Sequence, residues 1–158
     1  MKHEMQARYP APADVVIRMM TDREFHTRRL ERLGTSRYRV LEHAFDGQDF
    51  RIRIERHVPV RMPGLKGGAE TVVVNEERWN VATRAGSVVV EAGGMPVQMS
   101  CTTRIADDGD GCVLRFDWDI DASIPLVGKT LEKFIVADME QRAEGETAAG
   151  ISLLDAYR

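Results

Sequence analysis

Polar and apolar residues follow two different periods along this chain. A period of two, typical of strands with one covered face, predicts strands at residues 2–9, 36–45, 49–58, 69–81, 87–92, 97–105 and 112–121. A spacing of three and four residues, typical of amphipathic helices, occupies three other stretches. It predicts short helices at residues 12–20 and 22–33, and one long helix at residues 124–158.

The long C-terminal helix has an apolar stripe that is interrupted by charge. Pro125 suits the first turn of a helix, where its missing N–H is not needed. Asp138, Arg142 and Glu146 follow one another at intervals of four within the stripe, so Arg142 can pair with either carboxylate. Two interpretations stay open: a polar spot inside a pocket, or an ion-pair ladder in solvent. The apolar stripe consists of Val127, Leu131, Phe134, Ile135, Met139, Ala149, Leu153 and Tyr157.

The order of these elements predicts an α+β fold. One strand and two short helices precede six strands joined by short turns, which is the pattern of an antiparallel meander. Because the strands alternate, one face of the sheet must be covered, and only the long C-terminal helix is large enough to cover it. A curved sheet wrapped on a helix in this way leaves room for a cavity between the two.

The composition excludes several classes of function. A net charge of −3 over 158 residues lacks the basic footprint of non-specific nucleic-acid binding. No apolar run at the N-terminus indicates a signal peptide or a membrane span, so we expect a single domain, residues 1–158, in the cytoplasm. Cys101 and Cys112 are expected to be buried free thiols on neighbouring strands. Cys101 should lie opposite a residue near Phe116, out of disulfide reach of Cys112.

Four short motifs give the chain a resemblance to a known superfamily. They are Tyr9-Pro10-Ala11-Pro12-Ala13, Glu77-Arg78-Trp79, Gly94-Met95-Pro96-Val97, and Ile124-Pro125-Leu126-Val127-Gly128-Lys129 with Leu131-Glu132. With the element order they resemble the START-like superfamily, also called SRPBCC, which includes polyketide cyclases, birch-pollen-allergen-like proteins and lipid-transfer domains. Within it the chain is similar to a bacterial family of unknown function. The resemblance implies a helix-grip fold with a hydrophobic pocket between sheet and helix, and it implies no particular reaction.

The candidate ligand-binding residues are aromatic, sulfur-containing and charged side chains expected on the covered face and on the long helix. Ordinary core packing is the alternative for each apolar candidate. The loop at residues 59–68 is expected to be either a lid or a packed connection, and a histidine beside it is a candidate acid or base. The candidates are Trp79, Met99, Phe116, Trp118, Phe134, Ile135, Asp138, Met139 and Arg142 in the pocket, and His57, Met62 and Leu65 at its mouth or lid.

The sequence has no catalytic motif and no metal-ligand spacing. Its histidines are scattered, and the acidic turn at residues 107–111 lacks the downstream glutamate of a calcium loop. We therefore expect no metal, no cofactor and no catalytic residue. The leading hypothesis is binding of a hydrophobic small molecule, lipid-like or polyketide-like, in the cavity.

Two other functions stay open. The first is an enzyme of polyketide-cyclase type, in which Asp138, Arg142, Glu146 or His57 assists proton transfer. The second is a protein-interaction module, which an exposed apolar patch at the lid or at Ile151 and Leu154 would favour. The sequence also leaves a homodimer open.

Overall fold

A computed structural model describes residues 1–59 and 70–158 of the chain, so the predicted lid residues Met62 and Leu65 lie outside the described residues. Seven strands, three α-helices and one short 3-10 helix make up the described part. They are β1 (Lys2–Tyr9), α1 (Ala13–Met20), α2 (Arg23–Arg32), β2 (Tyr38–Phe45), β3 (Asp49–Pro59), β4 (Glu70–Asn80), β5 (Ala85–Ala92), β6 (Val97–Asp108), β7 (Gly111–Ala122), α3 (Gly128–Ser152) and η1 (Leu154–Tyr157).

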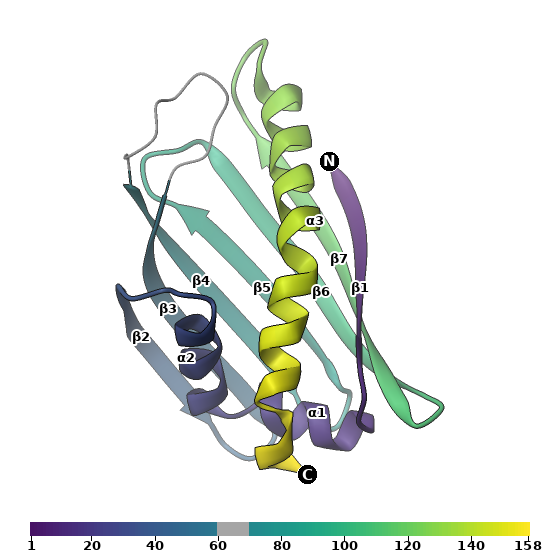
Figure 1. The fold of residues 1–158 in the computed structure, drawn as a ribbon. Helices are drawn as coiled ribbons and strands as arrows, with labels where there is room; N and C mark the ends of the chain where they lie inside the picture. Colours follow the sequence, from purple (N-terminus) through teal and green to yellow (C-terminus); the bar gives the residue numbers. More distant parts are fainter. Residues whose placement is uncertain (60–69) are drawn as a thin grey trace.

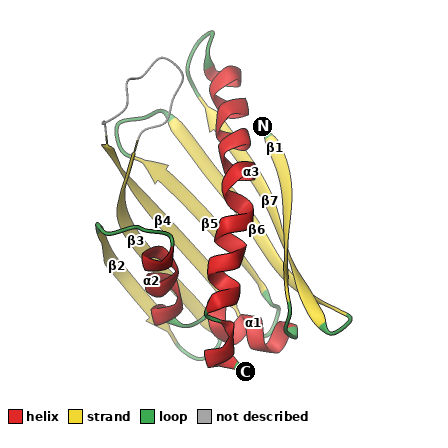
Figure 2. Ribbon diagram, viewed as in Figure 1, coloured by secondary structure: helices red, strands yellow, loops and turns green. Residues whose placement is uncertain are grey.

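All the strands form one antiparallel sheet in the order β1-β7-β6-β5-β4-β3-β2. Strands β2 to β7 are the predicted meander, and β1 is added at its end by pairing with β7. Figure 1 shows α3 lying across one face of the sheet, with α1 and α2 on the same side near the end of α3. The same view coloured by element type shows that all helices of the described residues lie on this one face (Figure 2). The predicted α+β helix-grip architecture is confirmed.

The long helix is shorter than predicted at both ends. It begins at Gly128, after a turn at residues 125–127 in which Leu126 has φ of +71° and a fully exposed side chain. Pro125 therefore precedes the helix instead of occupying its first turn. A Cβ on Gly128 would collide with the carbonyl oxygen of Ala122, so the end of β7 and the start of α3 touch at backbone level. After Ser152 the chain continues as the 3-10 helix η1.

One turn also differs from the prediction. The sequence suggested a turn near Ala85-Gly86, but the turn occupies residues 81–84, and both of these residues belong to β5. The Asn80 side chain accepts hydrogen bonds from the N–H and the hydroxyl of Thr83, at 2.9 and 3.1 Å, and so closes the turn. Arg84 takes a left-handed φ of +55°, which glycine would adopt more readily.

The two cysteines are buried free thiols, as predicted. Cys101 lies opposite Trp118, two residues beyond the expected Phe116, and Cys112 lies opposite Asp107. Burial raises the pKa of the Cys101 thiol to about 12 and that of Cys112 to about 11, so both stay protonated at neutral pH.

Strand register arranges the covered face of the sheet in rows that cross the strands. On β3 and β4 the row nearest α1 is apolar, and each row farther along contains one polar residue. From the α1 end, the rows contain Phe50, Trp79, Gly86, Thr103 and Phe116; then Ile52, Glu77, Val88, Cys101 and Trp118; then Ile54, Asn75, Val90, Met99 and Ile120; and then Arg56 and Val73.

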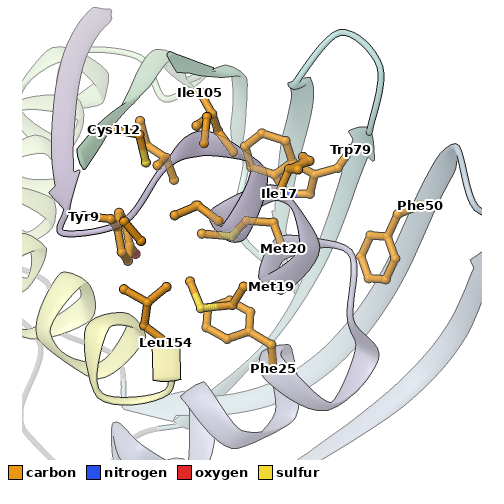
Figure 3. Packing of buried hydrophobic residues seen from close by; sticks show 14 of the residues in the cluster. Tyr9, Ile17, Met19, Met20, Phe25, Phe50, Trp79, Ile105, Cys112 and Leu154 are labelled. Carbon is orange, nitrogen blue, oxygen red and sulfur yellow. The ribbon is translucent and has the colours of Figure 1, made fainter. Parts of the chain in front are cut away.

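The hydrophobic core consists of two separate clusters. The larger surrounds α1 and joins it to the sheet and to η1 through Met19, Trp79 and Leu154, all at most 2% exposed. Figure 3 shows this cluster, with Phe25 of α2 and Tyr9 of β1 closing its sides. The smaller cluster lies at the other end of α3 and consists of Val97, Ala122 and Leu131 with their half-buried neighbours. Between the clusters, the inward-facing residues Glu77, Val88, Val90 and Trp118 belong to neither.

The backbone of α3 packs against Tyr9 at Gly150. A Cβ here would lie 2.6 Å from the Tyr9 hydroxyl oxygen, whereas Gly145 in the same helix has no such neighbour within 4 Å. We expect Gly150→Ala to lower the free energy of unfolding by about 1–3 kcal/mol through overpacking. Gly145→Ala should raise it by about 0.5–1 kcal/mol, because alanine favours the helix. Urea unfolding measures both changes, and changes of the same sign would contradict this packing.

Candidate functional site

The middle of the covered face is only partly shielded from solvent. The α3 backbone approaches β7, β1, α2 and η1 most closely, which leaves the β3–β5 side of the sheet less covered. Several inward-facing side chains in this region are half-buried although they hold core positions on their strands. We call this region the trough. Its residues are Arg56, Asn75, Glu77, Val88, Val90 and Trp118.

Glu77 is the centre of a charged cluster on the floor of the trough. Its carboxylate lies 3.1 Å from His26 Nδ1 and 3.5 Å from a guanidinium nitrogen of Arg29, and the Trp79 indole N–H donates a hydrogen bond to it at 3.2 Å. Burial alone would raise the pKa of this carboxyl group. The neighbouring His26 and Arg29, together with the hydrogen bonds, outweigh burial and lower the Glu77 pKa to about 2. Glu77 is therefore an ionised carboxylate with its partners in place.

His26 extends from α2 toward the sheet, and both of its ring nitrogens face acceptors. Nε2 lies 2.7 Å from the carbonyl oxygen of Met20, which can only accept, and Nδ1 faces the Glu77 carboxylate. The imidazolium form donates at both nitrogens, so the geometry fits a buried ion pair with Glu77. The ring is 2% exposed and stacks on Phe50 with 5.2 Å between centroids, which fixes its orientation.

Arg56 is the last inward-facing charged residue on β3. Its Nε donates a hydrogen bond to Asn75 Oδ1 on β4 at 3.0 Å. Burial and the nearby Arg142 lower the pKa of Arg56, and attraction to Glu146 offsets only part of this effect. These influences also show that the charged residues of α3 lie near the Arg56 end of the trough.

The predicted ladder on α3 forms as two ion pairs. Arg142 reaches the carboxylates of Asp138 and Glu146, each at 2.9 Å. The side chains are 28% exposed for Asp138, 45% for Arg142 and 50% for Glu146. The ladder therefore lies at the rim of the trough, between the two predicted alternatives, and each pair stabilises the helix by only about 0.3–0.5 kcal/mol.

The other predicted pocket residues occupy two environments. Trp79 and Met139 are core residues, at 2% and 8% exposure, where packing explains them. The half-buried ones are Met99, Phe116, Trp118, Phe134 and Ile135. Of these, Phe116 packs against the larger cluster, and Met99 and Ile135 pack against the smaller one. Their contact with a ligand remains a prediction.

The remaining candidates lie away from the trough. His57 is half-buried, occupies the opposite face of β3 from Ile54 by strand alternation, and has Nδ1 3.9 Å from Glu70. Of the two residues that would have formed an apolar interaction patch, Ile151 is exposed but Leu154 is 1% exposed and belongs to the core. That pair therefore does not form a patch.

Sequence reasoning missed the polar half of the site. Neither the pairing of His26 with Glu77 nor that of Arg56 with Asn75 was anticipated. The alternation of the strands did carry a signal for two of these four residues. Glu77 shares a strand face with Trp79, and Arg56 follows Ile52 and Ile54 at the same two-residue spacing.

Two surface hollows lie outside the trough. One, of about 540 Å³, is at the ends of β2, β3 and β5 and includes the exposed ring of Phe45. The other, of about 370 Å³, is between α2 and Leu153. Among the residues of known placement, no three His, Cys, Asp or Glu side chains are grouped as metal ligands would be. No helix in residues 1–59 and 70–158 is both long and apolar enough to span a membrane.

Solved structures place the fold in the START-like class. The crystal structure of TTHA0849 from Thermus thermophilus has a TM-score of 0.68 and 20% identity, covering 99% of this chain and 98% of that one. A START superfamily protein from Mycobacterium smegmatis has a TM-score of 0.59 and 14% identity, with 99% of each chain covered. The di-domain ARO/CYC protein BexL has a TM-score of 0.64 and 21% identity, over 98% of this chain and 46% of that one. At these identities the likeness shows the fold alone.

The chain belongs to the family described as protein of unknown function (DUF2505), which matches residues 4–152. No curated protein matches the sequence. Both parts of the resemblance inferred from the sequence, the START-like superfamily and a family of unknown function within it, are thereby confirmed.

Proposed function

We propose that the protein binds a hydrophobic small molecule, lipid-like or polyketide-like, in the trough between the sheet and α3. The observation that carries this proposal is the half-burial of inward-facing Val88, Val90 and Trp118 between two well-packed clusters. Apolar side chains at core positions are normally fully covered, and partly exposed apolar surface on the covered face of a sheet favours an apolar ligand. The named START superfamily neighbour has the same architecture, which is compatible with this use of the fold.

The charged cluster favours binding over proton transfer as the role of this site. A general acid or base works best with a pKa near the operating pH. The Glu77 pKa of about 2 is far below neutrality, and its carboxylate already contacts His26, Arg29 and Trp79. Glu77 therefore acts as a fixed charge that shapes the trough floor.

A substitution that fills the trough tests the proposal. Val90 faces inward opposite Asn75, and its neighbour Val89 faces outward and is 37% exposed. We expect wild-type protein to bind the neutral fluorescent probe Nile red, and Val90→Trp to weaken this binding about tenfold or more by occupying the trough. Val89→Trp, the same change on the opposite face, should leave the affinity unchanged. Titration of Nile red fluorescence gives all three dissociation constants.

Either of two results would contradict the proposal. Absence of Nile red binding to the wild type, or equal affinities for wild type and Val90→Trp, would remove the trough as the binding site. Circular dichroism of both tryptophan variants verifies that they are folded, so that lost binding reports an occupied trough.

A further inference from the structure

We propose that the ligand of the trough carries a carboxylate group, and that Arg56 and Asn75 bind it. This inference rests on the proposed function, since it names the chemical class of the same ligand. Its basis is a positive charge in the trough that has no partner of opposite sign, beside an amide that offers only donors.

The carboxylates of the trough and of the ladder each contact a cation other than Arg56. The carboxylate of Glu77 contacts His26 and Arg29, at 3.1 and 3.5 Å. Asp138 and Glu146 both bind Arg142 at 2.9 Å. Within residues 1–59 and 70–158, no carboxylate lies at ion-pair distance from Arg56, whose one side-chain partner is the neutral Asn75.

The ten residues outside the described part do not supply the missing charge. Residues 60–69 contain no aspartate and no glutamate, and they include the cations Arg61 and Lys66. A carboxylate for Arg56 must therefore come from outside the chain. A half-buried cation without a partner is costly, and a bound anion removes that cost.

The hydrogen bond between Arg56 and Asn75 fixes what the pair can recognise. Arg56 Nε is a donor, so the atom that receives it must be the Asn75 oxygen. Among residues 1–59 and 70–158, the Asn75 NH₂ group and the two terminal nitrogens of Arg56 have no hydrogen-bond partner. The pair therefore offers mainly donors, which favours a ligand with acceptor oxygens.

Arg56 and Asn75 are both half-buried residues. In the described part of the chain, the Thr103 hydroxyl is the only side-chain polar atom that is both fully buried and without a partner, so the nitrogens of Arg56 and Asn75 are not among the fully buried, unsatisfied atoms. A guanidinium group holds a carboxylate through two parallel hydrogen bonds, which suits this edge of the site.

The apolar part of the ligand has a matching surface next to the donors. Ile54 and Val73 lie beside Arg56 and Asn75 in the sheet register, and Val90 and Met99 follow in the Asn75 row. An amphiphile with its carboxylate at Arg56 would extend its apolar body across this row.

Displacement of Nile red by three probes with the same twelve-carbon chain tests the inference. We expect dodecanoate to bind about tenfold or more tightly than dodecanol at pH 7.5, because a charge-assisted hydrogen bond replaces a neutral one. Dodecyltrimethylammonium should bind more weakly than dodecanol. The wild-type comparison requires no substitution, so it stands even if a variant fails to fold.

Substitutions on β3 test whether Arg56 causes the preference for dodecanoate over dodecanol. Arg56→Gln should lower the affinity for dodecanoate to about that for dodecanol in the same variant, and Arg56→Lys should retain part of the preference for dodecanoate through its charge. The matched control is Arg53→Gln on the same strand, because the Arg53 side chain faces the other way, toward Glu91 at 3.9 Å. It should behave as the wild type.

The outcomes separate this inference from the proposed function. Equal binding of dodecanoate and dodecanol by a protein that still binds Nile red would overturn the carboxylate site and leave the apolar site standing. A preference that survives in Arg56→Gln, or that Arg53→Gln removes, would overturn the assignment to Arg56. Failure to bind Nile red would remove both proposals together.

Discussion

Replacing Glu77 by alanine is expected to lower the free energy of unfolding by about 3–5 kcal/mol, because it leaves the buried His26 ring and the half-buried Arg29 guanidinium without their carboxylate partner. In the described structure the Glu77 carboxylate is the only side-chain acceptor for His26 Nδ1 and for the Trp79 indole N–H. The residues His26 and Trp79 are each only 2% exposed, so water does not easily replace the lost carboxylate. For a chain of this size the loss corresponds to a fall in Tm of about 10 °C or more. Urea unfolding followed by circular dichroism measures it.

The control for Glu77 is a glutamate whose ion pair is exposed. Glu91 on β5 is 64% exposed as a side chain and lies 3.9 Å from Arg53 on the outer face. Glu91→Ala should change the free energy of unfolding by no more than about 0.5 kcal/mol. If both glutamates gave losses of the same size, the buried cluster would not have the role assigned to it.

The same contribution should appear in the wild type as a dependence on pH. Folding lowers the Glu77 pKa from an ordinary value of 4.5 to about 2, so the folded state favours the ionised form. Stability from this group is therefore complete above about pH 4.5 and is lost as the pH falls toward 2, by an amount on the order of 3 kcal/mol. Glu77→Ala should show a shallower fall across this window, and parallel curves for the two proteins would argue against the assignment.

Local patterns were sufficient for most of the fold. Alternation in β7 depends on neighbours in the sequence, and so does the start of α2, where Asp22 accepts a hydrogen bond from the Glu24 N–H at 3.2 Å. Both elements were predicted within a few residues. The start of α3 was wrong because it depends on tertiary contact: Gly128 packs against the Ala122 carbonyl, and proline preference alone cannot reveal that contact. Helix and strand ends set by packing are the part that periodicity does not determine.

The candidate site likewise combines contacts local to one helix, which the sequence predicts, with tertiary contacts, which it does not. The spacing of Asp138, Arg142 and Glu146 predicts their ion pairs, because an i, i+4 ladder is local to one helix. The contact between His26 and Glu77 joins α2 to β4, and its existence depends on where the helix lies over the sheet. Alternation could place Glu77 on the covered face but could not supply its partners.

Gly86 was read from the sequence as a turn glycine, but the structure gives it a packing role. It lies opposite Trp79 in the register of β4 and β5, on the covered face. A Cβ at this position would collide with the Arg78 carbonyl oxygen and would lie 3.0 Å from both the Trp79 ring and Thr103 Oγ1. Real Cβ atoms do not approach a backbone carbonyl so closely, so a larger residue must separate the two strands or displace the indole.

We expect Gly86→Val to lower the free energy of unfolding by about 3 kcal/mol, at the upper end of the range for overpacking, because a backbone atom and a fully buried ring both oppose it. Ser87→Val is the matched control, since it places the same side chain at the next position of β5, on the opposite face, where a β-branched residue suits a strand. Its effect should stay within about 0.5 kcal/mol. Urea unfolding of the two variants decides the matter: if valine is tolerated equally at both positions, then the close approach of β5 to Trp79 does not govern this part of the core.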